Sequence, residues 1–215
     1  MFRTALLSAL LAVAAYACSA WLTHDFQVWT AEGARRLEVA LQPIATPAVQ
    51  IDGPGIGPQP PPLSQFLADG RSVTLVDFVY TRCRTVCLAL GSVYQQMQAT
   101  LQAASPDDAA ARQVKLLSIS FDGTHDKPQV LQAYAARLGA DPLLWRFVRM
   151  PDAKETRRLL ADFQVVVVPD GRGDFEHNAA LLVIDQRGRL VRIFDYAEQQ
   201  LALDYARYLA SAASP

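Results

Sequence analysis

The chain has 215 residues, of which 51% are hydrophobic and 19% are charged, so it can bury a full core without a framework of disulfides. Its formal net charge is -1, its pI is near 6.3 and its basic residues are not clustered, which argues against a nucleic-acid-binding function. The three cysteines are Cys18, Cys83 and Cys87.

The N-terminal segment is apolar. No charged residue lies between Thr4 and Thr23, and Arg3 precedes this run. A membrane-spanning helix needs about 20 residues, so residues 1–23 are predicted to form an uncleaved anchor or a signal peptide, with the positive end in the cytoplasm. A lipoprotein cut ahead of Cys18 is a further alternative. All three export the rest of the chain.

Residues 24–62 are predicted to be an extended N-terminal segment followed by a connector. The stretch from Glu32 to Val39 is interpreted as the approach to a first strand. Seven of the 13 prolines lie between Pro43 and Pro62, together with three glycines. This composition is typical of a loop or a polyproline-like connector and excludes a core helix.

Residues 63–215 are predicted to form one α/β domain. Apolar strand patterns alternate with helical patterns, which indicates βαβ units, and a closing hairpin adds an antiparallel edge. The expected sheet is therefore mixed and mostly parallel, with helices on both faces. The predicted strands are 73–80, 114–121, 145–148, 180–185 and 190–194, and the predicted helices are 88–101, 128–138, 152–163 and 198–209.

Cys83 and Cys87 are the strongest functional signal in the sequence. They lie where the strand 73–80 gives way to a helix, at the end of the sheet where ligands bind in open α/β folds. The helix dipole and the flanking Arg82 and Arg84 supply positive charge, a condition for thiol reactivity. Residues four apart share a helical face, so both sulfurs can address one centre.

A third ligand is expected from His177, which directly precedes the predicted strand 180–185. If that strand lies beside strand 73–80, its leading loop brings the imidazole over the thiols. Two cysteines and one histidine suit Cu(I), and with an added ligand Cu(II).

Other interpretations of these residues are open. Paired cysteines in an exported domain often form a structural disulfide, although so short a loop gives little chain-entropy stabilisation. Zinc would need a fourth ligand, for which His125 is the candidate, although a solvated loop residue is the simpler interpretation of this histidine.

Several motifs together resemble the SCO/SenC family in order and spacing. They are Tyr80-Thr81-Arg82-Cys83 through Cys87, Ser118 to Asp122 with Asp126-Lys127-Pro128, and His177-Asn178 through Asp185. The resemblance covers roughly residues 65–210. The chain departs from the family pattern at Arg84 and Leu88, where members commonly have proline.

The resemblance implies a thioredoxin-like domain on a membrane anchor, exposed to the periplasm or to the mitochondrial intermembrane space. It implies one copper ion on Cys83, Cys87 and His177, delivered to the copper-bearing subunit of cytochrome c oxidase. Other copper chaperones or thiol reductants are possible partners. Asp122 corresponds to an acidic residue that tunes the site, or it caps the turn before Pro128. The alternative functions are a thiol-disulfide reductase acting through the two cysteines and a redox or copper sensor.

Overall fold

The computed structural model describes residues 2–26, 28–57, 59–83, 86–171 and 174–212, and it leaves the side chains of residues 86–89 undescribed. The chain divides into two compact units, Met1–Glu38 and Val39–Pro215. In the first unit, helix α1 (Phe2–Leu22) is long and apolar enough to cross a membrane by length and composition. This helix occupies the segment for which the sequence predicts a membrane anchor or a signal peptide.

The prediction that the stretch from Glu32 to Val39 leads into a first strand is wrong. These residues lie instead in helix α2 (Ala31–Leu41). The Glu32 carboxylate pairs with Arg35 at 2.8 Å and with Arg36 at 3.1 Å. Ion pairs three and four residues apart join neighbouring turns of a helix, and the charge pattern therefore favours the helix that is observed.

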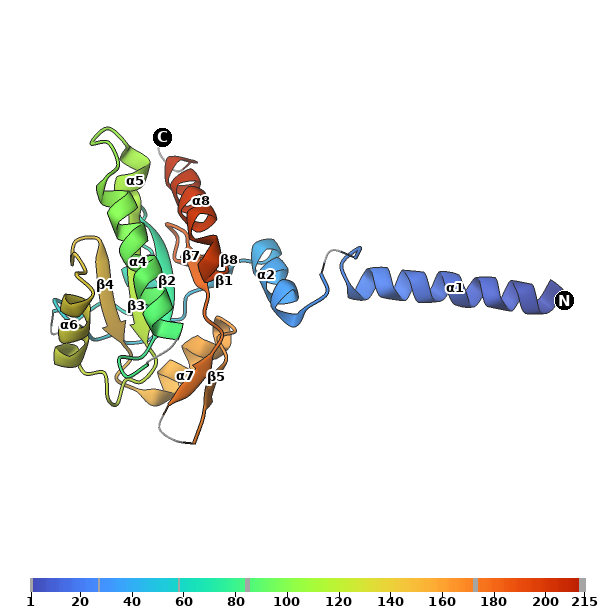
Figure 1. The fold of residues 1–215 in the computed structure, drawn as a ribbon, viewed down its shortest axis with the longest axis horizontal. Helices are drawn as coiled ribbons and strands as arrows, with labels where there is room; N and C mark the ends of the chain where they lie inside the picture. The colour runs from blue at the N-terminus through green and yellow to red at the C-terminus, as the bar shows by residue number, and fades with distance from the viewer. Residues whose placement is uncertain (1, 27, 58, 84–85, 172–173, 213–215) are drawn as a thin grey trace. The chain divides into compact units, whose positions relative to one another are not determined.

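A six-stranded mixed sheet forms the centre of the second unit, in the order β1-β8-β7-β2-β3-β4 (Figure 1). The strands β2, β3 and β4 are parallel, whereas β7, β8 and β1 continue the sheet with antiparallel pairing. The predicted fold class and its antiparallel edge are confirmed. The strand bounds are β1 (Ile44–Ala45), β2 (Val73–Val79), β3 (Val114–Ser120), β4 (Trp145–Arg149), β7 (Leu181–Ile184) and β8 (Arg189–Phe194).

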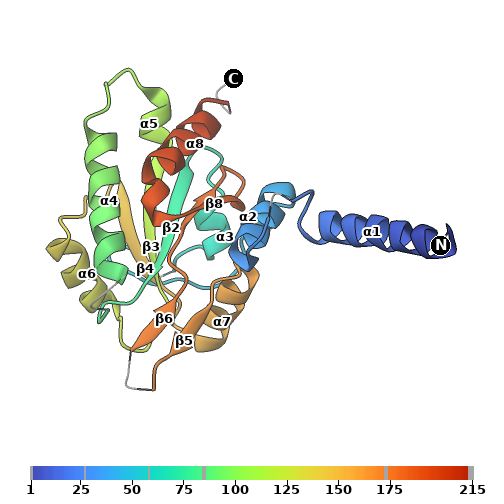
Figure 2. The same cartoon turned by 45° about the vertical axis from the view of Figure 1, so that its right-hand side comes forward.

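Helices cover both faces of this sheet (Figures 1 and 2). Leu90, Tyr94 and Met97 of α4 share one buried cluster with residues of α6 and α8, and Leu63 and Leu159 of α3 and α7 belong to the cluster on the other face. The elements predicted from Val73 onward are all observed in the predicted order, but the structure adds helix α5 before β3 and the short strands β5 and β6 before β7. The helix bounds are α3 (Leu63–Leu67), α4 (Val86–Gln102), α5 (Ala109–Gln113), α6 (Pro128–Arg137), α7 (Ala153–Asp162) and α8 (Gln199–Ala212).

The proline-rich connector is anchored to the edge strand β4. Asp52 and Arg149 exchange backbone hydrogen bonds of 2.9 and 2.8 Å, and their side chains form an ion pair at 2.8 Å. The neighbouring Val49 and Ile51 are buried. The connector therefore forms part of the folded domain, although its described residues before Leu63 include no helix after α2.

Gly53 provides a test of this docking. A Cβ atom at this position would lie 2.4 Å from the backbone oxygen of Phe147. We expect Gly53→Ala to lower the free energy of unfolding by about 1–3 kcal/mol, because backbone atoms must shift to accommodate the methyl group. Urea unfolding of the variant measures this loss.

The matched control is Gly57→Ala in the same connector. A Cβ atom there meets nothing within 4 Å, so its free energy of unfolding should stay within about 0.5 kcal/mol of the parent value. Equal stability of the two variants would contradict a docked connector.

Candidate metal centre

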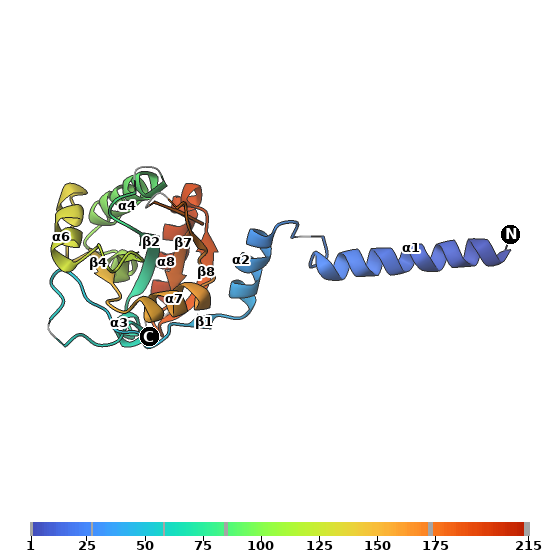
Figure 3. The ribbon, with the colours of Figure 1, turned by 90° about the horizontal axis from the view of Figure 1, so that it is seen from below.

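Cys83 lies in the turn that follows β2, at the carboxyl end of the parallel strands. Its side chain is buried, with 7% of its surface exposed, and its N–H donates to the Tyr80 carbonyl at 3.2 Å. Helix α4 begins three residues later, at Val86. The structure therefore places the first predicted thiol at a strand end and a helix start, as the sequence indicates. Figure 3 views the molecule from below, the side on which α7 lies in Figure 1.

The second thiol is placed only through its backbone. Cys87 is the second residue of α4, but its side chain lies outside the described residues, as does Arg84. The predicted approach of the two sulfurs to one centre therefore falls outside what the structure describes.

His177 ends strand β6 (Phe175–His177), which pairs with β5 (Val167–Pro169) in a two-stranded sheet. Four residues later the chain enters β7, which is the antiparallel neighbour of β2. The adjacency of these two strands, on which the predicted role of His177 depends, is thus observed. The histidine reaches the carboxyl end of β2 because the β5–β6 hairpin immediately precedes β7.

Aromatic side chains surround the imidazole of His177. The centroid of the Phe121 ring lies 5.3 Å from the imidazole centroid and that of Tyr80 lies 6.5 Å away, both in edge-to-face geometry. Burial among these groups lowers the pKa of His177 below its ordinary value of 6.5. The imidazole is consequently neutral at pH 7, which is the form that ligates metals.

Tyr80 connects the cysteine turn to the hairpin that carries His177. Its ring is almost completely buried, and its hydroxyl donates to the Asp174 carboxylate and contacts the carbonyl of Phe175 at 3.2 Å. The same hydroxyl accepts the N–H of Phe175 at 3.3 Å. Tyr80 belongs to the motif Tyr80-Thr81-Arg82-Cys83, in which the sequence indicates no role for it. Its position three residues before Cys83 is the one signal that the sequence offers.

We expect Tyr80→Phe to lower the free energy of unfolding by about 1–3 kcal/mol, because hairpin groups lose a buried hydrogen-bond partner while the aromatic packing remains. Urea unfolding measures the loss. The control is Tyr208→Phe. Tyr208 lies on α8 and is 64% exposed, so its replacement should leave the free energy of unfolding nearly unchanged. If both variants lose the same stability, Tyr80 does not hold the hairpin.

Asp122 lies at the end of β3, beside the cysteine turn. Its carboxylate, 8% exposed, pairs with Arg82 at 2.6 Å and also accepts the Thr124 hydroxyl at 3.2 Å. Its carbonyl accepts the backbone N–H groups of His125 and Asp126. Asp122 therefore contacts both its own loop and Arg82, the residue before Cys83.

His125 is exposed in the β3–α6 loop and borders a cavity of about 450 Å³ with Thr81 and Arg82. The residues that the structure describes include no group of three or more His, Cys, Asp or Glu side chains able to hold a metal ion. The side chain of Cys87 lies outside that part of the chain, so this statement does not extend to the set formed by Cys83, Cys87 and His177.

A groove of about 460 Å³ opens beside the aromatic rings. Phe121, Phe175 and Asp122 line it together with Leu160 and Arg157 of α7. Two of these rings also pack against each other at 5.5 Å, and Phe121 contacts His177. The surface next to His177 is therefore concave and largely apolar.

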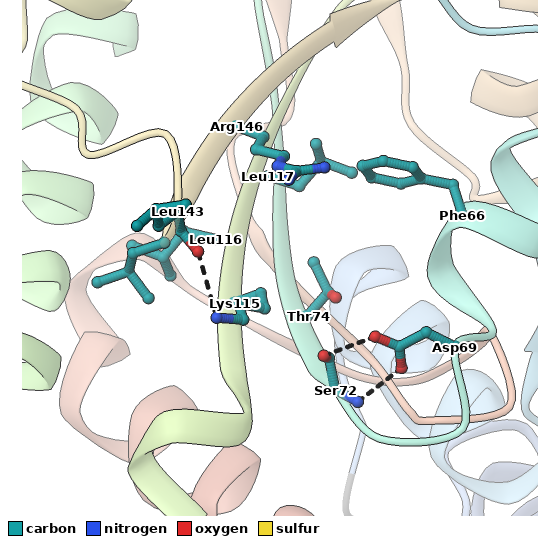
Figure 4. Close-up of a pocket in the computed structure, with 10 residues that line it drawn as sticks. Phe66, Asp69, Ser72, Thr74, Lys115, Leu116, Leu117, Leu143 and Arg146 are labelled. Atoms are coloured by element: carbon teal, nitrogen blue, oxygen red, sulfur yellow. Dashed lines mark hydrogen bonds between the residues drawn. The ribbon is translucent and has the colours of Figure 1, made fainter. Parts of the chain in front are cut away.

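A smaller cavity of about 150 Å³ lies at the amino ends of the parallel strands (Figure 4). There Lys115 donates from Nζ to the Leu143 carbonyl at 3.2 Å, and Ser72 donates to Asp69 at 2.7 Å. The residues that line this cavity include none of the predicted ligands. It is therefore separate from the candidate metal centre.

Comparisons with known proteins agree on one family. Residues 64–210 match the SCO1/SenC family. The SCO1 protein homolog of Bacillus subtilis is 26% identical over 128 residues, which span 59% of this chain and 63% of that protein.

Two solved structures share the fold. BsSco, a member of the Sco family of cytochrome c oxidase assembly proteins, is 21% identical with a TM-score of 0.56, over 67% of this chain and 82% of its own. Bradyrhizobium japonicum ScoI with copper bound is 24% identical with a TM-score of 0.50, over 64% and 85%.

Proposed function

Because this chain belongs to the SCO1/SenC family, we propose that it binds one copper ion through Cys83, Cys87 and His177 and delivers it to the copper-bearing subunit of cytochrome c oxidase. The observation that carries the proposal is the position of His177. Its imidazole, neutral at pH 7, packs against Tyr80, three residues before Cys83.

The chemistry of the donor set supports this cargo. Two soft thiolates and one imidazole suit Cu(I), which accepts low coordination numbers. A neutral imidazole needs no proton to leave before it binds. Copper is also present in the solved structure of Bradyrhizobium japonicum ScoI, a relative by fold.

The partner and the location form a second part of the proposal. BsSco, a neighbour by fold, belongs to proteins that assemble cytochrome c oxidase, and the groove beside Phe121 and Phe175 offers a concave surface for a segment of such a partner. Helix α1 would hold the chain in the membrane. With Arg3 on the cytoplasmic side, the domain would lie in the periplasm or an equivalent compartment.

The test is copper binding by the full chain in detergent under reducing conditions. One Cu(I) per chain is expected for the parent protein, and none at the same free Cu(I) concentration for the variant with Cys83→Ser and Cys87→Ser. The same chain should then transfer its copper to a purified apo oxidase subunit. Retention of one tight Cu(I) by the double variant would overturn the proposal.

Thiol-disulfide reduction is the second candidate. In that reaction the two thiols of Cys83 and Cys87 give two electrons and two protons to a substrate disulfide and become a disulfide themselves. It is favoured by the position of Cys83 at the start of a helix, where thiols are reactive. Turnover that survives His177→Ala and needs no copper would support it. A redox or copper sensor uses the same residues, and covalent capture of its target would identify it.

A further inference from the structure

Asp126 is a fully buried acidic residue next to the cysteine turn. Its exposed fraction is 0%, and its carboxyl group accepts three hydrogen bonds. The Thr81 N–H donates at 2.9 Å, the Thr81 hydroxyl at 2.5 Å and the Ser120 hydroxyl at 2.6 Å. Burial of a carboxyl group is costly unless donors satisfy it, so the group and its donors hold one another in place.

The groups on the far side of this carboxyl are rigid. Ser120 ends strand β3, and Asp126 itself is fixed by a backbone hydrogen bond of 2.8 Å to the Asp122 carbonyl. Pro128 starts helix α6 two residues later. Asp126 is thus attached to a strand end and a helix start, whereas Thr81 lies in the turn that carries the thiol.

Three consecutive residues before Cys83 are each tied to a different part of the fold. Tyr80 contacts the hairpin of His177, Thr81 contacts Asp126, and Arg82 pairs with Asp122. Among the contacts of these three residues within the described part of the chain, only that of Thr81 uses both its backbone and its side chain. It therefore fixes the position and the rotation of the turn two residues from the thiol.

We propose that Asp126 is a positioning residue for Cys83. Through its two hydrogen bonds with Thr81, called here the Thr81 clamp, Asp126 sets where the Cys83 thiol lies relative to the other reacting groups. The residue touches neither substrate nor metal in this role. The expected effect of Asp126 on Cu(I) affinity rests on the proposed function, because only a three-ligand site needs Cys83 and His177 at one point. The expected effect on the reactivity of the Cys83 thiol does not rest on the proposed function, since any reaction of Cys83 depends on the orientation of the turn.

Asp126→Asn provides the test in the full chain in detergent. The amide retains one acceptor oxygen but replaces the other with an N–H₂ group, so it cannot accept all three donors as before, and at least one hydroxyl must turn and accept instead. We expect the rate of Cys83 alkylation by iodoacetamide, measured in the Cys87→Ser background, to change by at least about tenfold. That is the lower end of what second-sphere partners of a metal ligand contribute. The Cu(I) affinity of the protein with both cysteines should fall by a similar factor.

The matched control is Asp108→Asn at the N-cap of α5, where the side chain accepts the Ala111 N–H at 2.8 Å and asparagine caps about as well as aspartate. It should leave both readouts within about twofold of the parent values. Thr81→Ser, which keeps the hydroxyl, should also behave like the parent, and Thr81→Val should change both readouts in the direction of Asp126→Asn.

The outcomes separate the two claims. If Asp126→Asn alters neither readout more than Asp108→Asn does, the inference is overturned. If Asp126→Asn does not fold, Thr81→Val decides, because it removes only one of the three hydrogen bonds. A change in alkylation rate without copper binding by the parent protein would retain the clamp and reject the proposed function.

Discussion

Replacement of His177 with alanine should lower the Cu(I) affinity of the reduced chain by at least about 100-fold. Even the outer partners of a metal ligand contribute about 10–100-fold, and the variant lacks one of three proposed ligands. Because burial lowers the pKa of His177, protons should compete with copper only below the ordinary imidazole pKa of 6.5. The affinity difference between parent and variant should therefore persist from pH 8 down to about pH 6.5. Competition with a Cu(I) chelator of known affinity measures it.

His125→Ala is the control for this experiment. His125 is exposed in a neighbouring loop at the same end of the sheet, so its loss tests whether any nearby imidazole is sufficient. We expect its Cu(I) affinity to stay within about twofold of the parent value, as for a site with no shared partners. Unchanged Cu(I) affinity in both variants would reject the three-ligand site. Equal losses would point to a four-ligand site of the kind expected for zinc.

Periodicity was sufficient for the elements that bury whole faces. Strand β2 is buried along its whole length, and its apolar run stands out in the sequence. The pairing of β7 beside β2 follows from the same kind of run. Strands β5 and β6 have only three residues each, and strand β1 has two. Elements this short cannot show a periodic pattern. The interpretation of Glu32 to Val39 as the approach to a strand leaves out the ion pairs of Glu32, and it therefore misses the helix.

The proposed ligands of the candidate centre stand out in the sequence, but the residues that support them do not. Cys83 and His177 are distinctive residue types next to predicted strand ends. The contact of Thr81 with Asp126 joins residues 45 apart, and that of Tyr80 with Phe175 joins residues 95 apart. Nothing in the local pattern relates such pairs, because their proximity is created by the order of strands in the sheet. The folded structure is needed to find the residues that orient the thiol.

Asp77 lowers the free energy of unfolding by an amount that depends on pH. It lies in β2 opposite Ser118 and is 1% exposed, and its Oδ1 has no hydrogen-bond partner among the described residues. Burial raises the pKa of Asp77 to about 7, and the Ser118 hydroxyl offsets this only in part. Burial and then the nearby Asp77 charge raise the pKa of Tyr94 well above its ordinary value. Ionised Asp77 therefore lies among groups that do not stabilise its charge.

The sign of the effect follows from the two pKa values. Below about pH 4 Asp77 is protonated in the folded and the unfolded chain, and it imposes no cost. Between about pH 4 and pH 7 the unfolded chain ionises while the folded chain keeps its proton, so stability falls by about 1.4 kcal/mol per pH unit. Above about pH 7 the cost is constant, on the order of 3–4 kcal/mol.

Asp77→Asn should therefore stabilise the chain at pH 8 relative to its effect at pH 4. The amide is neutral at every pH, so the difference in unfolding free energy between variant and parent should rise by on the order of 3–4 kcal/mol across this range. Urea unfolding of the full chain in detergent, with the thiols kept reduced, measures it. Asp204→Asn on the exposed face of α8 should show no such rise. A flat difference for Asp77→Asn would mean that its carboxyl group ionises as readily in the folded chain as in the unfolded one, and thus that a polar group or water reaches Oδ1 from outside the described contacts.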